Sequence, residues 1–159
     1  MQTQNENKKL VMFDFDGVLI NTQHLDNDFS VDDILHDAVL YLADKYELAI
    51  VSSASNKILN TFLKKENLDG CFKDVLGYEE HSSKVVRINS LLKKYNIEAK
   101  DSVLITDTLG DLKEANEAGA KSIAVLWGLH DHSTLANGNP NAIIENPNLL
   151  IKTIEDVLK

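Results

Sequence analysis

The sequence is poor in cysteine and in long apolar runs, and each shortage excludes a class of protein. Its single cysteine, Cys71, has no intramolecular partner, so a disulfide-stapled secreted domain is excluded. The stretch from Met1 to Lys9 is polar and lacks the apolar segment of a secretion signal, and no apolar run is long enough to cross a bilayer. We therefore expect a cytoplasmic protein without a membrane partner.

Basic residues are also scarce, because 16 lysines and arginines stand against 25 aspartates and glutamates, for a formal net charge of −9. Such a chain has no overall positive field to attract a phosphate backbone, so nucleic acid is not an expected partner. A site for a phosphorylated ligand would need a local positive charge from a metal ion, a lysine or helix N-termini. The length of 159 residues predicts one domain, over residues 9–159, after a disordered tail of residues 1–8.

Short apolar runs alternate with segments of helical periodicity, which is typical of a parallel α/β sheet. The runs expected as strands are Leu10 to Phe13, Leu48 to Val51, Val75 to Leu76, Val103 to Ile105 and Ser122 to Leu126. Helices are expected near Val31 to Ala43, Asn56 to Glu66, Ser83 to Tyr95 and Gly110 to Ala118, with a last one that Asn146 caps. The pattern predicts a three-layer α/β/α, Rossmann-like parallel sheet.

Two local features of this pattern are also predicted. Ser30 is expected to cap the first helix, with Asp32 and Asp33 in its first turn. The polar stretch from Gly128 to Asn141 is expected to form a surface loop.

Acidic residues stand where two of the expected strands end, and ligands bind at the carboxyl ends of the strands in such a sheet. Asp14 and Asp16 follow the first strand, and Asp107 and Asp111 follow the fourth. Carboxylates that cluster repel each other unless a cation lies between them, and oxygen ligands favour a hard cation. The structural alternatives are an acidic turn for the first pair and a helix N-terminal acid for Asp111.

Hydroxyl and lysine side chains follow the same pattern. Ser52 and Ser53 leave the second strand and enter a helix, where hydroxyls and free backbone N–H groups can hold phosphate oxygens. Lys84 stands near the start of the third helix, where its charge opposes the helix dipole, so local stability does not explain it. Helix capping and a solvated surface lysine are the structural alternatives. The ordered set is more informative than any of its members.

At this point the residues carry a family resemblance. The run Phe13 to Leu19 resembles the first motif of the haloacid dehalogenase superfamily, and the later motifs are matched by Ser52, Lys84 and Asp107 to Asp111. Trp127-Gly128 and the run Asn141 to Pro147 are similar to the tail of phosphoglycolate phosphatase-like members. Thr106 departs from the family pattern, in which a glycine is common just before the fourth-motif aspartate.

The resemblance implies a Mg²⁺-dependent phosphatase that hydrolyses a phosphate monoester through a phospho-aspartyl intermediate. Asp14 would be the nucleophile, and Asp16 would protonate the leaving oxygen and then deprotonate the water. Mg²⁺ would be held by Asp14, the backbone carbonyl of Asp16 and Asp107, with Asp111 in the outer shell or acting through water. The presence of Asp16 argues against the dehalogenases of the family.

The phosphoryl oxygens would be held by Ser52, the backbone N–H of Ser53 and Lys84. A slip of one residue exchanges the two serines as hydroxyl donor, and the sequence leaves this open. Mg²⁺ and Lys84 together would offset the repulsion between an anionic nucleophile and an anionic phosphoryl group.

No cap domain fits the spacing of the motifs, because the expected helices and strands already fill the chain between them. An open site can admit a phosphate on a bulky molecule, or it can be closed by a neighbouring subunit of a homo-oligomer. Residues Asn21 to Phe29 and Gly128 to Asn141 are the candidates for such a roof. The physiological substrate is not predicted.

Two rival functions remain open at this point. One is a catalytically idle binding module on the same fold, since a fold alone does not establish activity. The other is a receiver-like phospho-aspartate signalling domain, which would carry its phosphoacceptor after a middle strand and its lysine after the last one.

Overall fold

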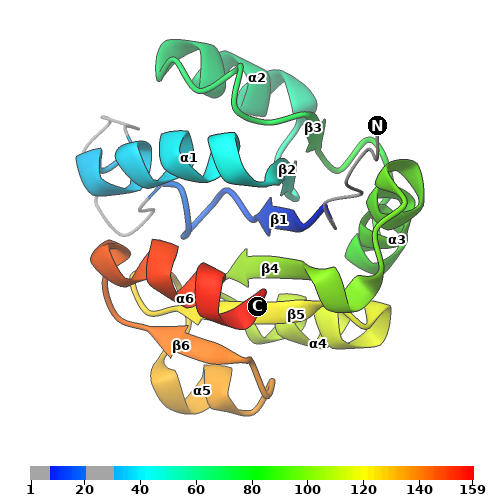
Figure 1. Cartoon of the computed structure of the whole chain (residues 1–159), viewed down its shortest axis with the longest axis vertical. Coiled ribbons are helices and arrows are strands. Elements are labelled where there is room, and N and C mark those ends of the chain that lie inside the picture. The colour runs from blue at the N-terminus through cyan, green and yellow to red at the C-terminus, as the bar shows by residue number, and fades with distance from the viewer. Residues whose placement is uncertain (1–7, 21–30) are drawn as a thin grey trace, which may run out of the picture.

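The computed structural model describes residues 8–20 and 31–159 and is built around one parallel sheet (Figure 1). The six strands lie in the order β3-β2-β1-β4-β5-β6. Their bounds are Leu10–Phe13 (β1), Glu47–Val51 (β2), Asp74–Leu76 (β3), Ser102–Thr106 (β4), Lys121–Val125 (β5) and Ala142–Ile144 (β6). The predicted tail, apart from Lys8, and the predicted roof segment Asn21 to Phe29 lie outside the described residues.

Helices cover both faces of the sheet. Their bounds are Asp33–Lys45 (α1), Asn56–Lys65 (α2), Lys84–Tyr95 (α3), Leu109–Ala118 (α4), His132–Ala136 (α5) and Leu150–Val157 (α6), with 3-10 turns at Ala99–Asp101 and Pro147–Leu149. Apolar side chains of α1, α2 and α6 form one buried cluster on one face, and those of α3, α4 and α5 pack on the other. The prediction of three α/β/α layers is therefore confirmed.

The central strand β1 shows why the sheet needs both layers. Val11 and Phe13 point into the cluster under α1, α2 and α6, while Leu10 and Met12 point into the cluster under α3 and α4. All four side chains are fully buried, as expected of a parallel strand with helices on both faces. The run of four consecutive apolar residues therefore indicates a central strand.

Three details differ from the sequence predictions. Helix α1 begins at Asp33 and is capped by Asp32, whose carboxylate accepts from the N–H groups of Ile34 and Leu35. Ser30, which the sequence predicts as the cap, lies outside the described residues. Asp131 caps the short helix α5, and an additional strand, β6, follows it. The stretch from 128 to 141 is therefore not simply a loop.

The order of the strands positions the candidate site. From β1 the chain passes through α1 to β2, which neighbours β1 on one side. It continues through α2 to β3 and then returns through α3 to β4, which neighbours β1 on the other side. A crevice forms beyond the carboxyl end of the strand at which the order reverses. Asp14 follows β1 directly and so lies at this position.

Candidate active site

Asp14 is held at the end of β1 by its own backbone and by the turn that follows it. Its N–H donates to the carbonyl of Ile105 at 3.0 Å, which continues the pairing with β4. One carboxylate oxygen, Oδ1, accepts from the N–H of Phe15 at 2.7 Å. Gly17 then turns the chain with a φ of +77°, a value that favours glycine. Asp14 is thereby buried while Asp16 is exposed.

Lys84 is a buried lysine at the first position of α3, only 3% exposed. Its Nζ lies 2.5 Å from Oδ2 of Asp111 and 3.4 Å from Oδ2 of Asp14. Burial lowers the pKa of Lys84, but the two carboxylates more than offset this and raise it overall. Lys84 is therefore a fixed cation that joins the ends of β1 and β4, and the alternative of a solvated surface lysine is wrong.

Asp107 follows β4 and is enclosed by backbone on two sides. Its Oδ2 accepts from the N–H of Leu129 at 2.8 Å. A Cβ added to Gly17 would lie 2.0 Å from that oxygen, and one added to Gly128 would lie 2.3 Å from the Cβ of Asp107. Both glycines are therefore required by the close approach of their backbones to this carboxylate. Burial raises the pKa of Asp107.

Asp111 lies in the first turn of α4 and is oriented by two partners. Besides Lys84, its Oδ2 accepts from the hydroxyl of Thr106 at 2.9 Å. Burial alone would raise the pKa of Asp111, but Lys84 and the hydrogen bonds to this carboxylate lower it overall. Thr106, which departs from the family pattern, is fully buried and holds Asp111 in place. No sequence signal indicated that role.

The two serines have different positions, and this bears on the alternative that the sequence left open. Ser52 is 1% exposed, and its hydroxyl oxygen accepts from the N–H of Ala54 at 3.1 Å. Ser53 is exposed and lines a cavity of about 270 Å³. The other residues that line this cavity are four aspartates, one lysine, one threonine and one leucine, namely Asp14, Asp16, Asp107, Asp111, Lys84, Thr108 and Leu129. The structure thus brings every predicted site residue to this cavity except Ser52, which lies directly beside it in the chain.

Arg87 is a buried residue that sequence reasoning missed. It is 2% exposed, and its guanidinium donates to the carbonyls of Ser52, Leu76 and Ser83. These carbonyls lie at the ends of β2 and β3 and at the start of α3. Arg87 stands one helical turn after Lys84, and this spacing was the only available signal of a shared role. It fixes the backbone around the cavity rather than facing the cavity.

The carboxylates of the cavity have pKa values that are shifted from their usual range. Burial raises the pKa of Asp14 from 3.8 to about 8, and the nearby Asp111 adds to this, while Lys84 opposes it. Partial burial also raises the pKa of Asp16. With all four carboxyl groups ionised, the cavity would carry more negative charge than Lys84 can balance, and a bound cation would relieve this excess.

The donor set fits a hard cation in part. The Oδ1 of Asp107 is buried and has no hydrogen-bond partner in the structure, which leaves a carboxylate oxygen free to bind a cation beside Asp14. Among residues 8–20 and 31–159, however, no group of three or more acidic, histidine or cysteine side chains could hold a metal ion. A cation here would therefore need backbone or water oxygens besides Asp14 and Asp107, because Asp111 already binds Lys84.

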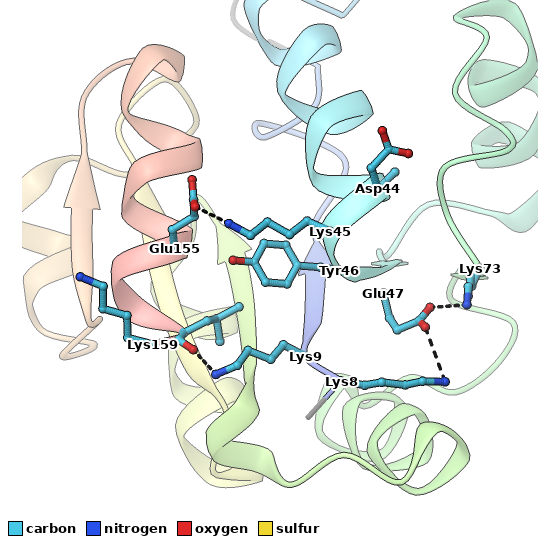
Figure 2. A pocket seen from close by; sticks show the side chains of 11 residues that line it. Lys8, Lys9, Asp44, Lys45, Tyr46, Glu47, Lys73, Glu155 and Lys159 are labelled. Carbon is cyan, nitrogen blue, oxygen red and sulfur yellow. Dashed lines mark hydrogen bonds and ion pairs between the residues drawn. The ribbon is translucent and has the colours of Figure 1, made fainter. Parts of the chain in front are cut away.

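A larger hollow, of about 820 Å³, lies at the opposite edge of the sheet, where β1 and β2 begin. Figure 2 shows that several of its charged side chains are paired with one another: Lys8 and Lys73 reach Glu47, at 3.9 and 2.6 Å, and Lys45 reaches Glu155. Because this hollow lies away from the carboxyl ends of the strands, it is not the candidate active site.

The sequence of the chain matches a known family of hydrolases. The model of haloacid dehalogenase-like hydrolases matches residues 26–125, which is more than half of the chain. The chain belongs to the haloacid dehalogenase-like hydrolase family. The match begins after Asp14 and Asp16, so it includes Ser53, Lys84 and Asp107 but does not cover the first acidic pair.

Members of this hydrolase family with curated functions are similar over part of their length. The phosphoglycolate phosphatase of Vibrio parahaemolyticus is 22% identical over 112 residues, which are 69% of this chain and 49% of that protein. The pyrophosphatase PpaX of Listeria monocytogenes is 24% identical over 140 residues, 86% of this chain and 64% of that protein. The chain thus spans about half the length of the phosphoglycolate phosphatases that it matches.

Solved structures of the family share the fold. A predicted phosphatase from Clostridium acetobutylicum superposes with a TM-score of 0.82 at 18% identity and covers 94% of this chain and 99% of that one. A haloacid dehalogenase-like hydrolase from Streptococcus pneumoniae has a TM-score of 0.75 at 17% identity, with coverage of 92% and 98%. The described helices include none that is long and apolar enough to cross a membrane.

Proposed function

We propose that this chain is a Mg²⁺-dependent phosphatase that hydrolyses phosphate monoesters through a phosphorylated Asp14. The observation that supports this most is the buried contact between Lys84 and Asp14, 3.4 Å apart, in a cavity that Asp16, Ser53 and Asp107 also line. The family and its phosphatase relatives make phosphoryl transfer the reaction that this arrangement suits best.

In the first step, a carboxylate oxygen of Asp14 attacks phosphorus and the bond from phosphorus to the ester oxygen breaks. Asp16, whose pKa is raised by partial burial, gives its proton to the departing oxygen. Lys84 and the hydroxyl of Ser53 hold the non-bridging phosphoryl oxygens. The products of this step are the free alcohol and phospho-Asp14.

In the second step, a water molecule gives a proton to the Asp16 carboxylate and attacks phosphorus. The bond from phosphorus to Asp14 then breaks, which releases inorganic phosphate and regenerates both aspartates. Thr106 and Arg87 act as positioning residues, since one orients Asp111 toward Lys84 and the other ties the backbone at the ends of β2 and β3.

Mg²⁺ would be held by Asp14, the backbone carbonyl of Asp16 and Asp107, whose Oδ1 is buried without a partner. When bound, this ion would offset negative charge on the phosphoryl group and on the carboxylates. Asp111 would stay with Lys84 and influence the ion from the outer shell.

The proposed activity is tested by an assay of phosphate release from a panel of monoesters, aryl phosphates included, in millimolar Mg²⁺ and in excess chelator. We expect release that requires Mg²⁺ and that is abolished in Asp14→Asn. A complete lack of turnover across the panel would favour the idle binding module, and unchanged turnover in chelator would refute the role of the ion.

A further inference from the structure

A second hollow adjoins the candidate active site on the side of α2. Its volume is about 950 Å³, within the usual range for small-molecule sites, whereas the cavity around Asp14 holds about 270 Å³. Among the residues that the structure describes, Asp16 alone lines both of them. The two spaces therefore meet at the side chain proposed to protonate the leaving oxygen.

The wall of this groove is mostly apolar. Phe15 and Ile20 contribute from the turn after β1, and Ile58 and Phe62 contribute from α2. The rings of Phe15 and Phe62 pack edge to face with centroids 4.8 Å apart, which makes this part of the wall rigid. Ile58 is 58% exposed, so its aliphatic side chain is open to a ligand in this groove.

The position of Asp16 determines how the bound ester is oriented in the site. The phosphoryl group must lie in the small cavity, against both Asp14 and Lys84, because the nucleophile and the buried cation line it. The oxygen that leaves must face Asp16, since that residue donates its proton. Whatever is attached to this oxygen then extends past Asp16, and the groove is the space that begins there.

We propose that this groove receives the leaving group, and that the substrates are phosphate monoesters whose alcohol has an apolar body. This inference rests on the proposed phosphatase function. An apolar alcohol would cover Ile58, the exposed aliphatic side chain of this wall, and it would gain affinity by leaving water. A short alcohol that does not reach Ile58 would gain nothing from it.

The test uses a series of primary n-alkyl phosphates from ethyl to octyl, assayed with Mg²⁺. Their alcohols differ little in leaving-group chemistry, so a trend in kcat/KM reports contact with the groove. We expect kcat/KM to rise about two- to fourfold for each methylene until the groove is filled. In Ile58→Asn the rise per methylene should be clearly smaller, because a polar side chain replaces part of the wall.

Leu149→Asn is the matched control, because Leu149 is a 41% exposed aliphatic residue that lines neither hollow. It should keep the wild-type dependence on chain length. Calorimetric binding of the matching n-alkyl phosphonates to Asp14→Asn gives a readout without turnover, and affinity should rise along the same series.

The outcomes separate this inference from the function on which it rests. Turnover with a flat or falling dependence on chain length would overturn the groove assignment and leave the phosphatase function intact. An equal loss of the trend in Ile58→Asn and Leu149→Asn would also overturn it. No turnover of any ester would overturn the phosphatase function, and the leaving-group assignment with it.

Discussion

Replacing Asp14 with asparagine should stabilise the metal-free protein while abolishing its turnover. The side chain is nearly isosteric, so the packing around it is preserved, but the amide carries no charge. Asp14 is buried beside Asp111, and its pKa is raised from 3.8 to about 8 by burial first and by that neighbour second. At pH values between the two pKa values only the unfolded chain ionises this carboxyl, which favours unfolding. At higher pH the folded protein must bury the ionised carboxylate, which also lowers the stability of the wild type.

The size and pH dependence of the effect follow from the displaced pKa. Since the folded pKa lies above the unfolded one, the stability that the protonated form contributes is fully present below about pH 4 and is lost as pH rises to about 8. The full displacement corresponds to about 6 kcal/mol. The opposite displacement at Asp111, which shares Lys84, offsets part of this. We expect a gain of about 2–4 kcal/mol above pH 8, or roughly 5–15 °C in Tm.

The assay is thermal unfolding of both proteins in chelator at pH 5 and at pH 8.5. The gain at pH 5 should be about a third of the gain at pH 8.5, because the unfolded carboxyl is only just ionised there. Asp16 and Asp107 titrate in both proteins, so the difference between them isolates Asp14. Millimolar Mg²⁺ should raise the Tm of the wild type more than that of the variant. A variant that is less stable than the wild type at pH 8.5, or equally affected at both pH values, would refute the reasoning.

Two further substitution pairs test the geometry of the site. Ser53→Ala should lower kcat/KM by about 10- to 100-fold through loss of a hydrogen bond to a charged group, whereas Ser52→Ala should mainly lower stability, by about 1 kcal/mol. The reverse ranking in a steady-state assay would show that Ser52 binds the phosphoryl group. Gly128→Ala should destabilise by about 1–3 kcal/mol and weaken Mg²⁺ activation, since its Cβ would lie 2.3 Å from the Cβ of Asp107. Gly110→Ala in α4, where nothing lies within 4 Å, is the control and should be neutral or slightly stabilising; equal effects of the two would count against the close approach.

The sheet could be predicted from the sequence because its central strands are continuous apolar runs. The run from Leu10 to Phe13 is buried on both faces, and such a continuous apolar run before an acidic turn is typical of a central parallel strand. The predictions failed where the signal was short or polar. Helix α5 has one fully buried residue, Leu135, and β6 is a three-residue edge strand, so neither gives a periodic pattern.

The candidate site could be predicted as a set of strand ends but not as a set of contacts. Parallel strands bring their carboxyl ends to one edge, which is why Asp14 and Asp107 could be placed together. The hydrogen bond from Thr106 to Asp111 depends on the turn into α4, and the contact of Gly128 with Asp107 joins two loops. Contacts of this kind depend on the final packing of the backbone, and no local pattern in the sequence encodes them.

The sequence also could not predict which of the two serines, Ser52 or Ser53, faces the cavity. Strand β2 ends at Val51, and the sequence does not say whether the alternation of side chains continues beyond it. In the structure Ser52 remains buried and Ser53 lines the cavity, because the chain bends at Ser53 and Ala54 before α2 begins at Asn56. A slip of one residue exchanges the two roles.

The central claim, that Asp14 is phosphorylated and that Asp16 serves the water step, is tested most directly by trapping the intermediate. Asp16→Asn keeps the nucleophile but removes the base, so an activated aryl phosphate should still phosphorylate it while hydrolysis is slow. Intact mass after rapid quenching in acid should show one added phosphoryl group in Asp16→Asn and none in Asp14→Asn, with peptide mapping to Asp14. Phosphoenzyme in neither variant, or a modified residue other than Asp14, would contradict the account.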